Sequence, residues 1–212
     1  MDYPRLIGPD SSRWTLLLSH GAGASTASYF FSEFSDRLIE KGKETEGIRI
    51  ALFDFPYMNK ALLTGKRYFP DPMDFLMKSY HEAIDYLNID PDRLIIGGKS
   101  MGARVASMIA EESNITALVC LGYPFHPRGQ SHKLRTEHLE LLSLPTLICQ
   151  GTRDPFGSFE DTKHYNLSSV IQFEWLPDGD HDFVPRKRSG HTLDENLNSM
   201  VSAVANFANS LS

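Results

Sequence analysis

The sequence predicts an α/β fold with an open, mainly parallel six-stranded sheet that carries helices on both faces. Short apolar runs rich in β-branched residues recur along the chain. They scarcely alternate polar with apolar residues, as is typical of parallel strands buried on both faces. Longer segments with a helical repeat of apolar residues separate these runs. Strands that alternate with helices in this way imply crossover connections and therefore a parallel sheet.

The predicted strands mark where functional residues are expected. They cover residues 14–19, 48–53, 93–98, 116–122, 145–151 and 171–176. Open parallel sheets bind their ligands at the carboxyl ends of the strands, so the segments that follow these strands are the places to search. Two connections, 54–73 and 122–144, are long enough to overhang a site at that edge.

Two of the predicted helices carry clear start signals. In segment 72–87 apolar residues recur at helical spacing, and Asp71 and Pro72 stand where an N-cap and a first helical residue are favoured. In the C-terminal segment apolar residues again recur at helical spacing, and Thr192 with Glu195 forms a capping-box pattern. We expect the C-terminal helix to pack on the sheet.

The composition is that of one globular domain over residues 1–212, because 41% of the residues are hydrophobic and 23% charged. A net charge of −6 leaves no basic excess for binding nucleic acid. Cys120 and Cys149 lie within apolar runs, so we expect buried thiols and no disulfide framework. The sequence shows no signal-peptide pattern and no apolar stretch of membrane-spanning length. We therefore expect a cytoplasmic protein without a membrane partner.

A G-x-S-x-G motif, Gly98-Lys99-Ser100-Met101-Gly102, follows the strand 93–98 and opens a predicted helix. Its glycines permit a tight strand-to-helix turn. Such a turn exposes the serine hydroxyl and directs the amides of a helix N-terminus toward developing negative charge. Ser100 is therefore a candidate nucleophile, and the alternative is a serine that only caps the helix.

A serine nucleophile needs a general base, and the base needs an acid that fixes its tautomer. After Ser100, the expected order of acid and then histidine is met by Asp154, which follows strand 145–151, and by His181, which follows strand 171–176. The alternatives are a turn-forming aspartate before a proline and a loop histidine among acidic residues.

Other residues compete for these two roles. The rival bases are His20, His126 and His164, and the rival acids are Asp178, Asp180 and Asp182. Only His181 follows the last predicted strand, which favours it as the base. Close sequence neighbours of a histidine seldom orient its ring squarely, which favours Asp154 as the acid.

An oxyanion hole needs backbone amides that face the developing negative charge. The residue after the nucleophile, Met101, is expected to supply one. The glycine-rich turn 19–25, "SHGAGAS", is expected to supply the other through Ala22, with Gly23 as the alternative. A plain flexible turn and a phosphate cradle are rival interpretations, although the turn lacks the lysine of a P-loop and the G-x-G-x-x-G spacing.

Three further features bear on substrate choice. Tyr57 and Met58 follow a strand end and are either possible substrate-binding residues or core residues. The cationic run Arg186-Lys187-Arg188 either holds an anionic substrate group or is a solvated loop. Lys99 either pairs with an acid or remains exposed. The eight histidines lack the spacing of metal ligands, so we expect no metal and no cofactor.

Together these blocks resemble the α/β-hydrolase fold, in the group of KANL/TEX-type hydrolase domains, and dienelactone hydrolases look like relatives. The resemblance runs from "HGAGA" through "FPYM", "GGKSMGARVAS", "LGYPFHP" and "QGTRDPFG" to "DGDHDFVPRKRSG". It implies Ser100 as nucleophile, Asp154 as acid and His181 as base. Ala103 stands where the family has a glycine. The chain resembles a minimal core version, without the usual first antiparallel strands and without a large lid domain.

The function expected from these features is cleavage of a small to medium carboxylic ester or thioester by a serine hydrolase through an acyl-enzyme. The resembling group includes a scaffold-like subunit of a eukaryotic histone acetyltransferase complex. A catalytically silent binding or assembly module is therefore the alternative, and acyl transfer to an acceptor other than water is a third possibility. The sequence predicts no oligomeric state.

Overall fold

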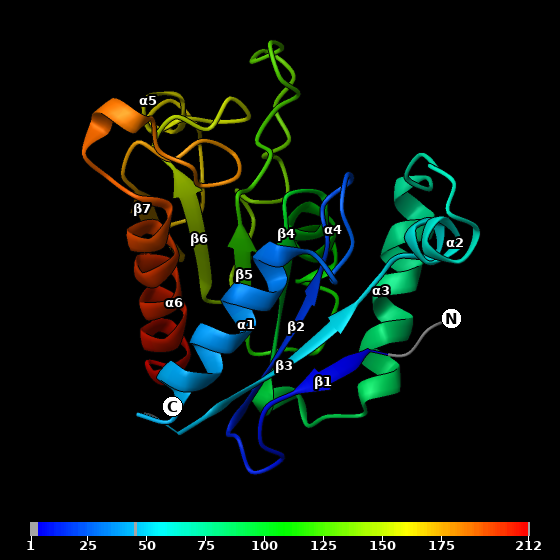
Figure 1. The fold of residues 1–212 in the computed structure, drawn as a ribbon. Coiled ribbons are helices and arrows are strands. Elements are labelled where there is room, and N and C mark those ends of the chain that lie inside the picture. Colours follow the sequence, from blue (N-terminus) through cyan, green and yellow to red (C-terminus); the bar gives the residue numbers. More distant parts are fainter. Residues whose placement is uncertain (1–3, 45, 212) are drawn as a thin grey trace.

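The computed structural model describes residues 4–44 and 46–211, which form a seven-stranded sheet flanked by helices (Figure 1). The strands are β1 Arg5–Ile7, β2 Trp14–Ser19, β3 Ile48–Phe53, β4 Leu94–Lys99, β5 Ala117–Leu121, β6 Thr146–Gly151 and β7 Ile171–Leu176. Their order across the sheet is β1-β3-β2-β4-β5-β6-β7. Neighbours from β3 to β7 are parallel, and β1 pairs antiparallel with β3. The predicted open, mainly parallel sheet is confirmed, but it has seven strands where six were expected.

Strand β1 is the element that the sequence did not reveal, and it corrects the expectation of a core without a first antiparallel strand. It places Arg5 opposite Leu52 and Ile7 opposite Ile50 along the edge of the sheet. The strand has three residues, and its Leu6 is 48% exposed. A strand this short and exposed leaves no apolar run in the sequence, so its hydrogen bonds to β3 are the feature that defines it.

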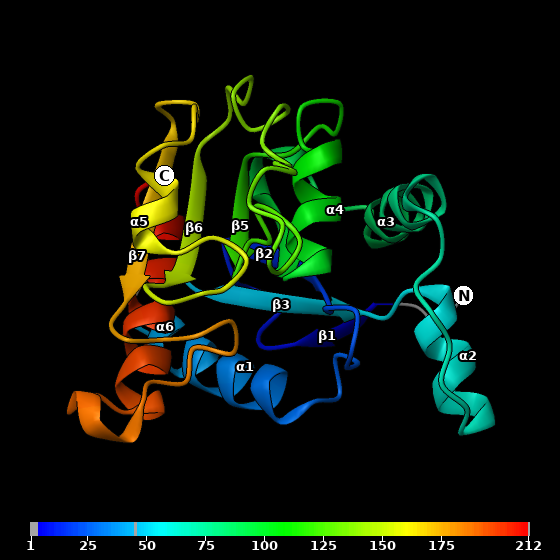
Figure 2. The same ribbon diagram turned by 90° about the horizontal axis from the view of Figure 1, so that it is seen from above.

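Helices cover both faces of the sheet (Figure 2). Helices α1 Tyr29–Gly42 and α6 Leu193–Asn209 contact each other on one face, and α3 Met73–Leu87 and α4 Met101–Ile109 contact each other on the other. Leu16 and Leu18 of β2 belong to the hydrophobic core under α1 and α6, whereas Leu17 belongs to the core under α3 and α4. Both faces of β2 are therefore buried, which explains why its sequence does not alternate.

The connection 54–73 contains a helix, α2 Pro56–Thr64. Asp71 does not cap α3 as predicted, because its Oδ2 accepts a hydrogen bond from the Tyr57 amide at 3.1 Å. It thus satisfies a free amide at the start of α2, and α3 follows Pro72 without a side-chain cap. The capping box of Thr192 and Glu195 at the start of α6 is confirmed.

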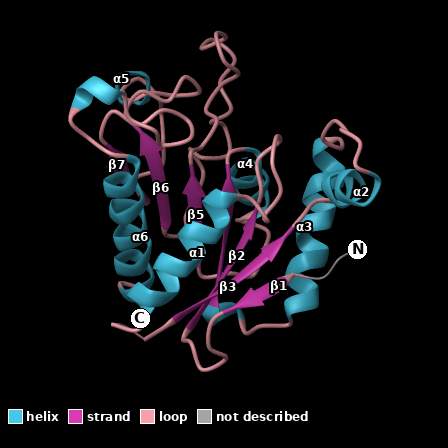
Figure 3. Cartoon of the chain, in the orientation of Figure 1, coloured by secondary structure: helices cyan, strands magenta, loops and turns pink. Residues whose placement is uncertain are grey.

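The connection 122–144 is a loop that rises beyond the carboxyl end of β5 (Figure 3). The remaining short elements are α5 Phe159–Thr162 and the 3-10 turns Pro91–Arg93 and Lys187–Ser189. Cys120 and Cys149 are buried, free thiols, as predicted. Within residues 4–44 and 46–211, no helix combines the length and the apolar character that crossing a membrane requires.

Candidate active site

Ser100 occupies a strained turn between Lys99, the last residue of β4, and Met101, the first residue of α4. Its φ of 54° and ψ of −111° lie in a region that residues other than glycine rarely adopt. The flanking glycines allow this turn to pass close to β2. A Cβ atom on Gly98 would lie 2.6 Å from the Gly102 carbonyl carbon, and one on Gly102 would lie 2.5 Å from the Ser19 carbonyl oxygen. Both glycines of the motif are therefore required by close packing.

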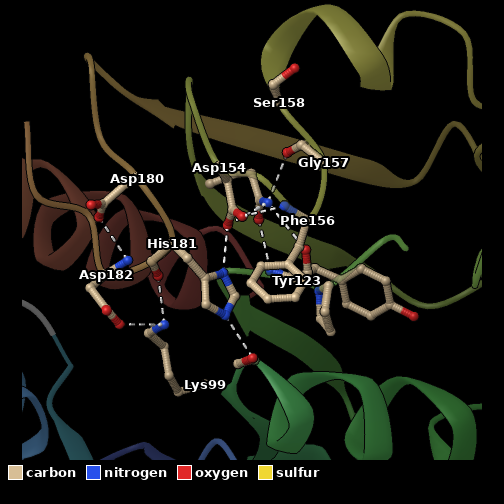
Figure 4. Close-up of polar contacts among 12 residues, drawn as sticks. Lys99, Tyr123, Asp154, Phe156, Gly157, Ser158, Asp180, His181 and Asp182 are labelled. Atoms are coloured by element: carbon tan, nitrogen blue, oxygen red, sulfur yellow. Dashed lines mark hydrogen bonds and ion pairs between the residues drawn. The ribbon is translucent and has the colours of Figure 1, made fainter. Parts of the chain in front are cut away.

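Three strand ends bring Ser100, Asp154 and His181 together. His181 Nδ1 lies 2.7 Å from Asp154 Oδ2 (Figure 4), and His181 Nε2 lies 2.7 Å from Ser100 Oγ. An ionised carboxylate only accepts hydrogen bonds, so the network assigns the ring proton to Nδ1. The lone pair of Nε2 then accepts the hydrogen bond of the serine hydroxyl. The three residues singled out in the sequence thus form one continuous hydrogen-bonded chain.

The carboxylate of Asp154 is 1% exposed, and hydrogen bonds compensate for its burial. Its Oδ1 accepts from the Phe156 amide at 2.8 Å, and its Oδ2 accepts from Gln150 Nε2 at 3.0 Å. Gln150 is itself fully buried in β6. The sequence reasoning missed this residue, although a glutamine inside the apolar run 145–151 was a visible signal.

The loop that carries His181 is held from several sides. The ring of Phe156 lies 4.4 Å from the imidazole, centroid to centroid. Buried Asn196 of α6 donates to the Phe183 carbonyl at 2.8 Å. Asp180 Oδ1 accepts hydrogen bonds from two amides of the same loop, at 2.9 and 3.0 Å. These contacts fix the imidazole between its carboxylate and the serine.

The rival acids are engaged elsewhere. Asp178 faces Arg186, whose hydrogen bonds hold the pKa of that carboxyl well below its ordinary value. Asp180 binds its own loop, as described above, and Asp182 Oδ1 lies 3.5 Å from Lys99 Nζ. Asp154 is thus the carboxylate on the imidazole of His181.

The rival bases also have other surroundings. His20 is fully buried, with Nδ1 2.6 Å from the Gly21 carbonyl oxygen and Nε2 accepting from the Phe55 amide at 3.0 Å. Burial lowers the pKa of His20, so this histidine acts as a neutral brace for the glycine-rich turn. His126 Nδ1 lies 2.9 Å from the carbonyl oxygen of the next residue, and His164 is exposed beyond α5.

A cavity of about 330 Å³ opens beside Ser100. Its lining comes from the glycine-rich turn, the start of α1, the turn at Ser100 and the His181 loop. The lining residues are Gly21, Ala22, Gly23, Ala24, Ser28, Phe30, Phe31, Lys99, Ser100, His181 and Asp182. Ala22 thus lies on the cavity wall, and Met101 directly follows Ser100 at the start of α4. Their roles as oxyanion donors stay predictions.

The three features expected to influence substrate choice have different surroundings. Tyr57 and Met58 lie in the hydrophobic core, outside the lining of this cavity, and the Tyr57 hydroxyl donates to the Ala22 carbonyl at 3.3 Å. The run Arg186-Lys187-Arg188 also lies outside that lining, and its first residue pairs with Asp178. Lys99 is 8% exposed and lines the cavity. Of the three features, only Lys99 therefore lies at the cavity. Tyr57 supports the glycine-rich turn from the side of the core.

A mainly parallel sheet with a serine at a strained strand-to-helix turn defines the class of α/β-hydrolase proteins. The chain belongs to the alpha/beta hydrolase domain family, which matches residues 12–209.

Solved structures share this fold over nearly the whole chain. A dienelactone hydrolase from Anabaena variabilis is 21% identical, with a TM-score of 0.66 over 97% of this chain and 88% of its own. An esterase from Exiguobacterium antarcticum is 17% identical, with a TM-score of 0.66 over 97% and 94%. An α/β serine hydrolase without a lid from Xanthomonas campestris is 17% identical, with a TM-score of 0.65 over 96% and 87%.

Proposed function

We propose that this chain is a serine hydrolase that cleaves small to medium carboxylic esters or thioesters through an acyl-enzyme on Ser100. The observation that carries the proposal is the continuous hydrogen-bonded chain from Asp154 through His181 to Ser100. It ends at a cavity large enough for a short acyl group. A serine that served only as a helix cap would need neither the histidine nor the buried carboxylate.

In the proposed reaction, Ser100 Oγ attacks the acyl carbonyl carbon while His181 Nε2 accepts the hydroxyl proton. The amides of Met101 and of Ala22, or of Gly23 in its place, stabilise the oxyanion of the tetrahedral intermediate. The alcohol or thiol then leaves with the proton from His181. Water, deprotonated by the same imidazole, cleaves the acyl-enzyme.

The family supports a hydrolytic role, and two of the similar structures are named as esterase and dienelactone hydrolase. These names favour esters as the substrate class. The KANL/TEX-type grouping, a cytoplasmic location and the absence of nucleic-acid and membrane partners stay predictions from the sequence. Acyl transfer uses the same acyl-enzyme, and adding alcohols or amines to the assay and analysing the products distinguishes it from hydrolysis.

The test is a series of p-nitrophenyl esters of increasing acyl length, assayed with the unmodified chain and with Ser100→Ala. We expect turnover of short and medium esters by the unmodified chain and none by the variant. Circular dichroism checks that the variant is folded. Turnover that survives Ser100→Ala would overturn the proposed nucleophile. No turnover at any acyl length would instead favour the non-catalytic assembly module.

A further inference from the structure

Lys99 places a buried ammonium group beside the candidate nucleophile. Its side chain is 10% exposed, and its Nζ lies 4.9 Å from the centre of the Phe183 ring. Desolvation by these surroundings lowers the pKa of Lys99, and nearby carboxylates, chiefly that of Asp182, only partly oppose this. The protein therefore keeps a costly cation at a position where the motif G-x-S-x-G accepts any residue.

The partners of this ammonium in the protein are incomplete. Nζ donates to the His181 carbonyl oxygen at 2.6 Å, which is a strong hydrogen bond to a neutral group. The carboxylate of Asp182 lies 3.5 Å away, and its side chain is 81% exposed. An ammonium has three donors, and a buried charge is stable only with close, well-placed partners. Lys99 thus has capacity for a further anionic acceptor.

Lys99 lines the same cavity as Ser100. Among the residues that line it, Lys99 is the one lysine or arginine. Phe30 and Phe31 provide apolar wall suited to methylene groups. The exposed cations of the run 186–188 lie outside the lining. The geometry therefore combines, in one cavity, a nucleophile, an apolar wall and a cation.

We propose that Lys99 binds a carboxylate on the acyl group, so that the preferred substrates are monoesters or monothioesters of short dicarboxylic acids. This inference rests on the proposed function and specifies its substrate class. The reaction stays a hydrolysis: water and the monoester yield the free dicarboxylate and the alcohol. The carboxylate at Lys99 only binds and takes part in no bond that forms or breaks.

The first experiment compares monoethyl glutarate with ethyl pentanoate, whose acyl chains have equal length and differ in the terminal carboxylate. We expect kcat/KM to favour the glutarate ester by about tenfold or more, because a desolvated ion pair discriminates strongly against a neutral group. In Lys99→Gln this ratio falls to about one. Glutamine keeps a side-chain N–H donor and removes only the positive charge, so the loss reports the charge. A ratio that Lys99→Gln leaves unchanged overturns the proposal.

Two further variants locate the effect. Lys187→Gln removes a positive charge from the exposed run after His181. The ratio of kcat/KM for the glutarate ester to that for ethyl pentanoate is expected to stay as in the unmodified chain. Asp182→Asn removes a carboxylate that competes for the ammonium, and the ratio is expected to rise. A ratio that is lost in Lys187→Gln and kept in Lys99→Gln would place the anion at the surface run and contradict the proposal.

A binding measurement separates this inference from the proposed reaction. In Ser100→Ala, which cannot form the acyl-enzyme, glutarate is expected to raise the unfolding temperature more than pentanoate. Adding Lys99→Gln to this variant is expected to abolish the difference. If the unmodified chain cleaves ethyl pentanoate but neither prefers the glutarate ester nor binds glutarate, the carboxylate subsite fails and the hydrolase stands. If glutarate binding depends on Lys99 while no ester is cleaved, the subsite stands and the hydrolase fails.

Discussion

Helix α4 has one serine–histidine pair at its start and a second within it, and the two differ in their hydrogen-bond networks. The Oγ of Ser100, at the start of the helix, lies 2.7 Å from His181 Nε2. The Oγ of Ser107, two turns further along, lies 2.8 Å from His138 Nε2. The distances are nearly equal, so distance alone does not distinguish the pairs. Their hydrogen-bond networks differ instead.

The Ser107 hydroxyl has a backbone acceptor in addition to the imidazole. The Arg104 carbonyl oxygen accepts from the Ser107 hydroxyl at 2.8 Å, and His138 Nε2 lies 2.8 Å from the same Ser107 Oγ. The Tyr123 hydroxyl likewise donates to the Arg135 carbonyl at 2.9 Å. Burial, together with the charge of Arg104, lowers the pKa of His138 to about 4. This imidazole is neutral at pH 7, and the two hydroxyls beside it both have backbone acceptors.

The backbone reinforces the contrast. Ser100 stands at a φ of 54° beside a cavity, whereas Ser107 is 2% exposed within the regular helix. His181 has the carboxylate of Asp154 on its second nitrogen, which sets its tautomer. Ser100, the proposed nucleophile, thus combines a nearby histidine with a carboxylate on that histidine, a strained turn and an adjacent cavity.

Removing each serine in turn gives the largest expected effect. Ser100→Ala is expected to lower kcat for an accepted ester on the order of 10⁶-fold, because both the nucleophile and its activation are lost. Ser107→Ala is expected to keep kcat within about threefold and to lose about 1 kcal/mol of unfolding free energy with its hydrogen bonds. Steady-state kinetics and urea unfolding provide the measurements. A comparable loss of kcat in both variants would remove the distinction between the pairs.

Changing the carboxylate tests what gives His181 its tautomer. Asp154→Asn is expected to reduce kcat on the order of 10⁴-fold, because the asparagine amide favours a proton on the wrong ring nitrogen. The hydrogen bond from the Phe156 amide to Oδ1 is retained by the asparagine oxygen, so the loop is expected to keep its shape. Circular dichroism serves as the folding control. Kinetics close to those of the unmodified chain would show that Asp154 is not the partner of the base.

The smallest expected effect is on the pH dependence of the unfolding free energy. The pKa of His138 is lowered in the folded chain to about 4 from an ordinary value of 6.5. Between these values the unfolded chain binds more protons, so stability falls as the pH falls. For this partly buried group the loss is on the order of 1–3 kcal/mol from pH 7 to pH 4.

Urea unfolding at pH 7 and pH 5 checks this expectation. His138→Gln is expected to weaken the pH dependence, and exposed His132→Gln is expected to leave it unchanged. Part of the dependence should persist in His138→Gln because burial also lowers the pKa of His20. Equal pH dependence in the two variants would show that His138 does not titrate as its burial requires.

The sequence predicted most of the fold and the three aligned side chains because these depend on local patterns. Buried parallel strands are continuous apolar runs, and their carboxyl ends meet at one edge of the sheet. Residues directly after three such strands, Ser100, Asp154 and His181, were therefore expected to lie close together, and in the structure they do. The G-x-S-x-G motif and the expected order of acid and then histidine selected these three residues from the others at that edge.

What the sequence did not predict depends on partners far along the chain. Strand β1 is defined by its pairing with β3. Asp71 lies next to the start of α2, where it accepts a hydrogen bond from the amide of Tyr57, 14 residues earlier. Tyr57 packs behind the glycine-rich turn, where its hydroxyl donates to the carbonyl of Ala22, 35 residues earlier. The environment of Lys99 is set by the His181 loop, 82 residues away. None of these contacts leaves a periodic signal.

We propose that Ser100, and not another serine, forms the covalent intermediate. The most direct measurement is peptide mapping by mass spectrometry after reaction with a fluorophosphonate probe. We expect one adduct, on the peptide that contains Ser100, formed at a rate that Asp154→Asn reduces strongly and Ser107→Ala leaves unchanged. An adduct on Ser107, or an unlabelled Ser100 in a chain that still cleaves esters, would contradict it.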